Sequence, residues 1–368
     1  MNRILDPGLF TNWLYPRLPS YLIYFVTARC NAKCQTCFYW QEIESASPKN
    51  ELSPDETEKI AEHLPRLIQL TISGGEPFLR EDLFPLLKPI IEKTRPLFLS
   101  IPSNGMLTER IVQTTEQLAM SYPWLSLNLE LSLDGIGELH NQIRGKDSAF
   151  EDLLKSFEEL KNLKKKYQNL RLAILTLLNA LNQAQIFELL EYIKAELAPD
   201  RIEALFIRGL VRNPETKNLS IEKFKPVSDW LDKENQKVKK NFIDRVRAEL
   251  AKEKRKKIIE TISQDKMLLP CQAGKKLLVF EPDGKVRACE MLDYIYPQPS
   301  AQLGLDNFLL GDLRAENYDL KKILNSDRAK KILKFIRQSQ CHCSYECAML
   351  ANLAFSAPQM IKISVKAL

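Results

Sequence analysis

Three cysteines at the end of an apolar run are the residues whose type and spacing best suit chemistry. Cys30, Cys34 and Cys37 follow residues 22–26, a Leu-Ile-Tyr-Phe-Val run that predicts a buried strand. We therefore expect the thiols in a loop at a strand's carboxyl end, where α/β proteins place their sites. A [4Fe–4S] cluster usually takes four thiolates, so three would leave one iron open. Zinc is the alternative, because closely spaced cysteines also suit that ion.

Five further cysteines lie near the end of the chain and predict a second metal site. Cys271 and Cys289 flank an expected hairpin whose antiparallel strands would bring the two thiols near each other. Cys343 and Cys347 are four residues apart and could bridge one helical turn. We expect this pair to complete the set of four thiolates, with Cys341 free or available to a substrate. Structural zinc is again the alternative.

Two turns and one polar loop follow other apolar runs. The tetrapeptide Gly74-Gly75-Glu76-Pro77 follows residues 67–73, and Ser103-Asn104-Gly105 follows residues 97–101. Glycines let a backbone approach a ligand closely, and the glutamate offers an acceptor. The loop after the strictly alternating run 125–133 contains Asp134, His140 and Arg144, and a guanidinium suits a carboxylate ligand.

The elements that must position these residues alternate along the first two hundred residues. Apolar or alternating runs predict six strands, at residues 22–26, 67–73, 97–101, 125–133, 170–178 and 202–207. Helices are expected between them, after the capping residue Ser53 and at 82–93, 108–120, 148–166 and 183–197. Such alternation predicts parallel βαβ units. Six units are fewer than the eight of a closed barrel, so we expect an α/β fold with a partial (β/α)6 TIM-like barrel.

The remaining segments give the domain organisation. We divide the chain into an N-terminal arm (1–20), the barrel core (21–212), a lysine-rich helical connection (213–268) and a small α+β cluster-binding domain (269–368). The lysines of this connection, which include the run 252–257, are interpreted as a solvated helix face. The alternative is a basic surface that grips an acidic peptide.

Composition limits the class of protein. The 368 residues are 45% hydrophobic with a formal net charge of +6, which permits an anionic substrate but does not favour nucleic acid. No apolar run is long enough for a membrane span, and the first residues lack the apolar core of a signal peptide. We therefore expect a cytoplasmic protein, whose eight cysteines serve as metal ligands rather than disulfides.

The CxxxCxxC spacing of Cys30, Cys34 and Cys37 after the first strand resembles the radical SAM superfamily. One departure is Thr36, where the family usually has an aromatic residue. The resemblance implies that the open iron chelates the amino and carboxylate groups of S-adenosylmethionine (SAM). Reductive cleavage of SAM then yields a 5′-deoxyadenosyl radical, so the cofactor carries the difficult chemistry.

The same resemblance implies which residues surround SAM. The GGEP motif would bind the amino group, and the turn after the third strand would lie near the adenosyl group. Ser132 would contact the ribose or carboxylate, Arg144 would pair with the carboxylate, and Asp134 belongs to the same matched motif. The cofactor-binding set is thus Gly74, Gly75, Glu76, Pro77, Ser103, Asn104, Ser132, Asp134 and Arg144. No residue is assigned as catalytic.

The segment from Cys271 to Cys289, with its Pro-Asp-Gly turn, resembles the SPASM/twitch domains that hold auxiliary [4Fe–4S] clusters. Five cysteines suit the shorter twitch type with one auxiliary cluster. The resemblance implies an enzyme that abstracts a hydrogen atom from a carbon of a peptide or small-molecule substrate, giving oxidation, crosslinking or epimerisation. It also implies a reductant partner such as flavodoxin or ferredoxin. The alternative function is a non-catalytic protein that binds zinc or another metal.

Overall fold

The computed structural model describes residues 19–236, 242–296, 303–339 and 341–368. The expected N-terminal arm, residues 1–20, lies almost wholly outside these ranges. The expected connection and C-terminal domain lie mostly within them.

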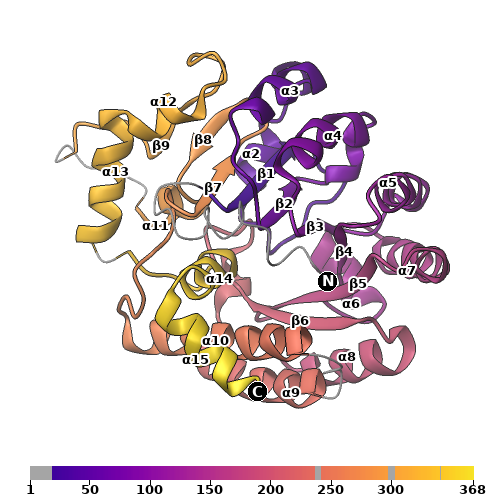
Figure 1. Ribbon diagram of the computed structural model, residues 1–368. Coiled ribbons are helices and arrows are strands. Elements are labelled where there is room, and N and C mark those ends of the chain that lie inside the picture. The colour runs from indigo at the N-terminus through magenta and orange to yellow at the C-terminus, as the bar shows by residue number, and fades with distance from the viewer. Residues whose placement is uncertain (1–18, 237–241, 297–302, 340) are drawn as a thin grey trace.

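One nine-stranded sheet organises the molecule, in the order β6-β5-β4-β3-β2-β1-β7-β8-β9 (Figure 1). Its first six strands are β1 (Tyr21–Thr27), β2 (Gln69–Gly74), β3 (Phe98–Ser103), β4 (Ser126–Ser132), β5 (Leu170–Leu178) and β6 (Arg201–Phe206). Each pairs in parallel with the next. All six expected strands are therefore confirmed to within a few residues, and the sheet is a partial barrel rather than a closed one.

Helices cover the outer face of this curved sheet (Figure 1). They are α3 (Pro54–Glu62), α4 (Leu83–Thr94), α5 (Thr108–Ser121), α7 (Ala149–Lys166) and α8 (Ile186–Tyr192), the last continued by a π-helical turn at Ile193–Leu197. Short helices α2 (Trp40–Glu44) and α6 (Glu138–Arg144) lie in the loops beyond β1 and β4. Ser53 caps α3 as expected, because its hydroxyl accepts from the Glu56 amide while the Glu56 carboxylate accepts from the Ser53 amide.

The C-terminal segment extends the same sheet. β7 (Leu277–Phe280) pairs in parallel with β1, and β8 (Lys285–Arg287) pairs antiparallel with β7, which is the expected hairpin. β9 (Leu309–Asp312) completes the sheet beside β8. The helices of this C-terminal segment are α11 (Leu292–Ile295), α12 (Leu320–Asn325), α13 (Asp327–Gln338), α14 (Glu346–Ala354) and α15 (Ala357–Lys366).

The expected connection forms two helices, α9 (Phe224–Gln236) and α10 (Phe242–Gln264). α9 packs on β6, while α10 packs on α9, α14 and α15. Residues from α10 and α14 line a cavity of about 520 Å³ together with side chains of the barrel strands. These two helices therefore lie on the open side of the barrel and form one wall of this cavity, which we call the chamber.

Candidate active site

The three N-terminal thiols lie together at the carboxyl end of β1. Cys30, Cys34 and Cys37 are each partly buried and all line the 520 Å³ cavity. Burial, and then the neighbouring Cys34 thiol, raises the pKa of Cys30 and of Cys37 to about 12. Thiolate ligands must lose their protons to metal. A group of thiols crowded in this way fits an iron–sulfur cluster, whose positive irons would reverse that shift.

The Gly-Gly turn after β2 packs against the backbone of this cysteine loop. The Gly75 amide donates to the Thr27 carbonyl and the Glu76 amide to the Arg29 carbonyl, each at 2.8 Å. A Cβ atom on Gly75 would lie 2.1 Å from the Arg29 carbonyl oxygen, so any side chain there is excluded. The glycines therefore let two neighbouring loops join directly.

Glu76 is the buried acid at the centre of this end of the cavity. Its carboxylate accepts hydrogen bonds from the Ser103 hydroxyl at 2.9 Å and the Asn104 amide at 2.8 Å. Burial raises the pKa of Glu76 to about 7. The Asn104 side chain in turn donates to the Asn31 side chain at 2.7 Å, inside the cysteine loop. Pro77 begins the short 3-10 turn that follows. The predicted GGEP and Ser-Asn segments thus meet around one carboxyl group.

Arg144 lies at the end of α6 and faces the cysteine loop. Its guanidinium pairs with the Asp134 carboxylate at 2.8 Å, donates to the Ser132 carbonyl at 2.8 Å, and reaches the Cys34 sulfur at 3.8 Å. Asp134 also accepts from the Leu177 amide at 2.7 Å. The expected partner of Arg144 was the SAM carboxylate; in this structure Arg144 already has a protein carboxylate and joins β4 to the cysteine loop.

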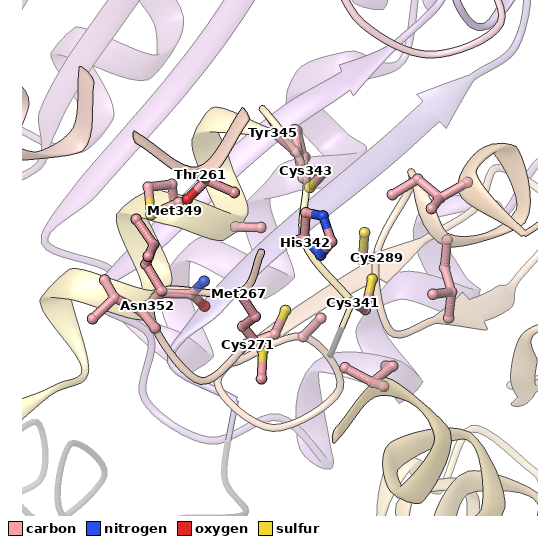
Figure 2. Close-up of a pocket in the computed structure, with 17 residues that line it drawn as sticks. Thr261, Met267, Cys271, Cys289, Cys341, His342, Cys343, Tyr345, Met349 and Asn352 are labelled. Atoms are coloured by element: carbon pink, nitrogen blue, oxygen red, sulfur yellow. The ribbon is translucent and has the colours of Figure 1, made fainter. Parts of the chain in front are cut away.

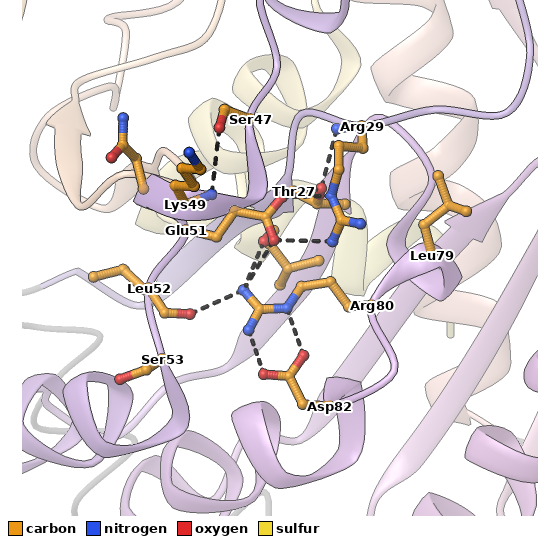
Figure 3. Close-up of polar contacts among 12 residues, drawn as sticks. Thr27, Arg29, Ser47, Lys49, Glu51, Leu52, Ser53, Leu79, Arg80 and Asp82 are labelled. Atoms are coloured by element: carbon orange, nitrogen blue, oxygen red, sulfur yellow. Dashed lines mark hydrogen bonds and ion pairs between the residues drawn. The ribbon is translucent and has the colours of Figure 1, made fainter.

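A second polar network holds the cysteine loop from the other side (Figure 3). Arg29 makes two hydrogen bonds of 3.0 Å to Glu51, and Thr27 also donates to that carboxylate. Arg80 pairs with Asp82 and donates to the carbonyl oxygens of Val26 and Leu52 at 3.1 and 2.9 Å. Arg29, which directly precedes Cys30, is therefore fixed to Glu51 in the segment before α3.

Four of the five C-terminal cysteines surround a separate small cavity of about 30 Å³ (Figure 2). They are Cys271, Cys289, Cys341 and Cys343. The charges of the other three each raise the pKa of Cys289, in addition to burial. The described ranges hold no three His, Cys, Asp or Glu side chains spaced as around a single bound metal ion. The donor set, four thiols around one cavity, fits a four-iron cluster.

Cys347, expected to be a ligand, lies elsewhere. It lines the large cavity and not the small one. Burial and the Glu290 carboxylate raise the pKa of the Cys347 thiol to about 11, while Tyr21 hydrogen bonds to it. The reason lies in the helix boundary. α14 begins at Glu346, so Cys343 is in the extended segment before the helix and the two thiols point to different cavities.

Tyr345 forms the wall between these two cavities, because its side chain lines both and is 1% exposed. Figure 2 shows it beside Cys343. On the large-cavity side, Arg208 lies over the Tyr345 ring and pairs with Glu346 at 2.6 Å. The cysteine loop and the second cysteine cavity are therefore connected through one chamber and one aromatic side chain.

Two regions of the chain match known protein families. A sequence profile of the radical SAM superfamily matches residues 24–193, and a profile of the SPASM iron–sulfur cluster-binding domain matches residues 271–348. The chain therefore carries a radical SAM region followed by a SPASM region. Its second matched region is an iron–sulfur domain rather than a zinc domain, so radical SAM and SPASM regions together imply [4Fe–4S] clusters, as expected from the cysteines.

Curated relatives of this chain are enzymes. The chain is 30% identical to pre-heme d1 synthase of Dinoroseobacter shibae over 172 residues, which cover 46% of this chain and 39% of that protein. It is 25% identical to AdoMet-dependent heme synthase of Methanosarcina barkeri over 286 residues, covering 74% and 77%. A GTP 3′,8-cyclase of Aliarcobacter butzleri is 25% identical over 184 residues, 49% of this chain and 54% of the cyclase. The first and third alignments thus span about half or less of those proteins.

Two solved structures share the fold of this chain. SuiB of Streptococcus suis superposes with a TM-score of 0.59 at 17% identity, over 89% of this chain and 69% of SuiB. Native anSMEcpe with bound AdoMet superposes with a TM-score of 0.61 at 18% identity, over 94% and 99%. None of the helices in the described ranges has the length and apolarity needed to cross a membrane.

Several charged residues of the chamber were not predicted from the sequence. Glu203 lies within β6, is 3% exposed, and pairs with Lys254 of α10 at 2.7 Å. Glu290 is buried beside Arg208, and burial raises its pKa to about 7. A glutamate within an apolar strand was a visible signal of a polar interior at Glu203. Glu290 carried a weaker signal, its position directly after Cys289.

Proposed function

We propose that this chain cleaves SAM reductively at a cluster held by Cys30, Cys34 and Cys37, and uses the radical to take a hydrogen atom from a carbon of its substrate. The observation that carries the proposal is the shared chamber, which the three thiols and Glu76 line together. The bound cluster supplies one electron to SAM. The chain's own residues hold and orient SAM and keep bulk water away from the reacting carbon.

Glu76 is assigned to the SAM ammonium group. Its carboxyl is buried, faces the chamber and is fixed by Ser103 and Asn104. An ammonium ion brought beside this carboxyl favours its ionised form and lowers its raised pKa. Arg144 is assigned to the carboxylate end, where it remains anchored to Asp134. The turn of Ser103 and Asn104 is assigned to the adenosyl side.

An auxiliary four-iron cluster is assigned to Cys271, Cys289, Cys341 and Cys343. The support is their shared cavity, whereas Cys347 faces the substrate chamber. This set replaces the expected pair Cys343 and Cys347 with Cys341 and Cys343. The wall residue Tyr345 places the chamber next to the auxiliary thiols, which favours electron exchange between the substrate and the auxiliary cluster.

The substrate is proposed to be a small molecule or one residue of a peptide. A chamber of about 520 Å³ is in the usual size range of small-molecule sites. The relatives named above are heme synthases and a nucleotide cyclase, while SuiB has been solved with its precursor peptide SuiA. Small molecules and peptides should therefore both be tested as substrates. A one-electron reductant such as flavodoxin or ferredoxin is part of the same proposal.

The test is anaerobic incubation of the reconstituted protein with SAM and a reductant, with 5′-deoxyadenosine quantified by mass spectrometry. Wild type should form it, and the Cys30→Ala/Cys34→Ala/Cys37→Ala variant should form none while it keeps auxiliary iron. Equal 5′-deoxyadenosine formation by this variant would refute the assignment.

A further inference from the structure

Helices α12 and α13 carry an unusual concentration of positive charge. Residues 320–339 contain seven Lys or Arg and one Asp, an excess equal to the formal net charge of the whole chain, +6. The exposed members form what we call the basic face: Lys321, Lys322, Lys330, Lys331, Lys334 and Arg337. The excess charge of the protein is therefore concentrated on one pair of helices.

The charges of the basic face are mostly not neutralised by neighbours. Lys330 pairs with Asp327 at 3.0 Å, but for the other five no carboxylate lies within ion-pair distance among the residues that the structure describes. Two of the three lysines in the last turn of α7 differ, because Lys164 pairs with Asp200 at 2.5 Å and Lys166 with Glu116 at 3.8 Å. The basic face therefore differs from a solvated helix surface on which most charges are balanced by ion pairs.

The opposite face of α13 covers the auxiliary cysteines. Ile336 lines their cavity, and its carbonyl accepts from the Cys341 amide at 3.2 Å. Leu333 packs so closely on Gly274 that a Cβ there would lie 2.4 Å from the leucine side chain. A helix with its side chains is roughly 10–12 Å across. The basic face is therefore separated from the auxiliary thiols by a single helix, a span that electrons can cross by tunnelling.

We propose that the basic face is the docking surface for an acidic one-electron carrier protein of the flavodoxin or ferredoxin class. This inference rests on the auxiliary cluster of the proposed function. One electron passes from the reduced carrier to the auxiliary cluster, so the carrier is oxidised by one electron and the cluster reduced by one, with no bond made or broken. Opposite charges steer such encounters and raise the association rate.

The test compares two charge-reversal variants of the full-length, iron-reconstituted protein. The first is Lys331→Glu/Lys334→Glu/Arg337→Glu on α13. The matched control is Lys155→Glu/Lys165→Glu/Lys166→Glu, three exposed lysines of α7, which lies on the far side of the molecule from α13 in Figure 1. Both change the net charge by the same amount. Stopped-flow bleaching of cluster absorbance by photoreduced flavodoxin gives the second-order rate constant.

The α13 variant should react roughly tenfold or more slowly than wild type at low ionic strength, and the α7 variant within about twofold. The difference should largely vanish at about 0.5 M salt, where charges are screened. Reduced methyl viologen, a small reductant, should reduce all three proteins equally. Should the α13 variant lose iron, Lys321→Glu/Lys322→Glu on α12 replaces it, with a smaller slowing expected.

Equal rates for the α13 and α7 variants, with iron content equal to wild type, would overturn the docking surface and leave the proposed function intact. So would tighter binding of a short DNA duplex than of flavodoxin to the wild-type basic face, because the face would then serve nucleic acid. Absence of iron from the C-terminal cysteines in wild type would instead refute the auxiliary-cluster assignment, on which the docking surface rests.

Discussion

At the scale of single residues, the proposed SAM site contains a carboxyl group that is buried before its ligand arrives. Glu76 is 1% exposed and receives three hydrogen bonds, from Ser103, Asn104 and the Phe78 amide at 3.2 Å. Its pKa of about 7 means that it is protonated in much of the protein below neutral pH. An incoming ammonium group favours the ionised form, so SAM binding and proton release are linked.

We therefore predict that SAM affinity rises as pH increases through about 7 and then levels off, because the carboxylate is ionised above its raised pKa. Glu76→Gln should lower the affinity by roughly ten- to a hundredfold, the usual value of a charge-assisted contact, and abolish this pH dependence. Equilibrium binding of SAM to the anaerobic protein measures both. Glu81→Gln, with a side chain 81% exposed, is the matched control and should bind as wild type. A Glu76→Gln protein with the wild-type pH profile would contradict the assignment.

A second prediction concerns Cys341 and Cys347, because sequence spacing alone could not decide which of them is a cluster ligand. Cys341→Ser should lose the auxiliary cluster and fall from about eight to about four irons per chain, whereas Cys347→Ser should keep all eight. The physical reason is that Cys341 lines the small cavity with the three other thiols and Cys347 lines the substrate chamber. Iron and sulfide assays after anaerobic reconstitution decide it. The reverse pattern would restore Cys347 as a ligand.

At the scale of elements, local sequence patterns predicted the strands and helices of the barrel. They did not predict contacts between segments that are distant in the sequence. The alternation of residues 125–133 predicted β4, and the Ser53 cap predicted the start of α3, because both signals are local. The expected helix at 108–120 forms as α5 (Thr108–Ser121), for the same reason. No local signal specified the pairing of β7 with β1, since those strands are some 250 residues apart. The side on which Cys347 lies depended on where α14 begins, a boundary that spacing cannot fix.

The contact between the GGEP turn and the cysteine loop gives a prediction at the same scale. Gly75→Ala places a methyl group against the Arg29 carbonyl oxygen at 2.1 Å, so one of the two loops must move. We expect loss of the SAM cluster, leaving about four irons per chain, with the auxiliary cluster intact. Gly137→Ala, where nothing lies within 4 Å of the new atom, has only the strain of its φ of +56° and should keep about eight. Full iron in Gly75→Ala would show that the loops are not interlocked.

At the scale of the whole molecule, one continuous sheet holds both cysteine sites. β1 carries the first cysteines at its carboxyl end and pairs with β7, which leads to the hairpin before Cys289. The two cavities meet at Tyr345. The radical SAM and SPASM regions thus share one sheet and line one chamber. The cofactors were predicted from the family resemblance. The position of Cys347 and the charged residues of the chamber became visible only in the structure.

The most direct test of this account is EPR of the reduced, iron-loaded protein with and without SAM, together with iron content, in wild type and two variants. Wild type should hold about eight irons and show two cluster signals, only one of which changes with SAM. The Cys30→Ala/Cys34→Ala/Cys37→Ala variant should hold about four irons and a signal that SAM does not change. The variant with Ala at Cys271, Cys289, Cys341 and Cys343 should keep the SAM-sensitive signal alone. A SAM-sensitive signal in the first variant, or none in wild type, would contradict the claim that the N-terminal thiols hold the SAM cluster.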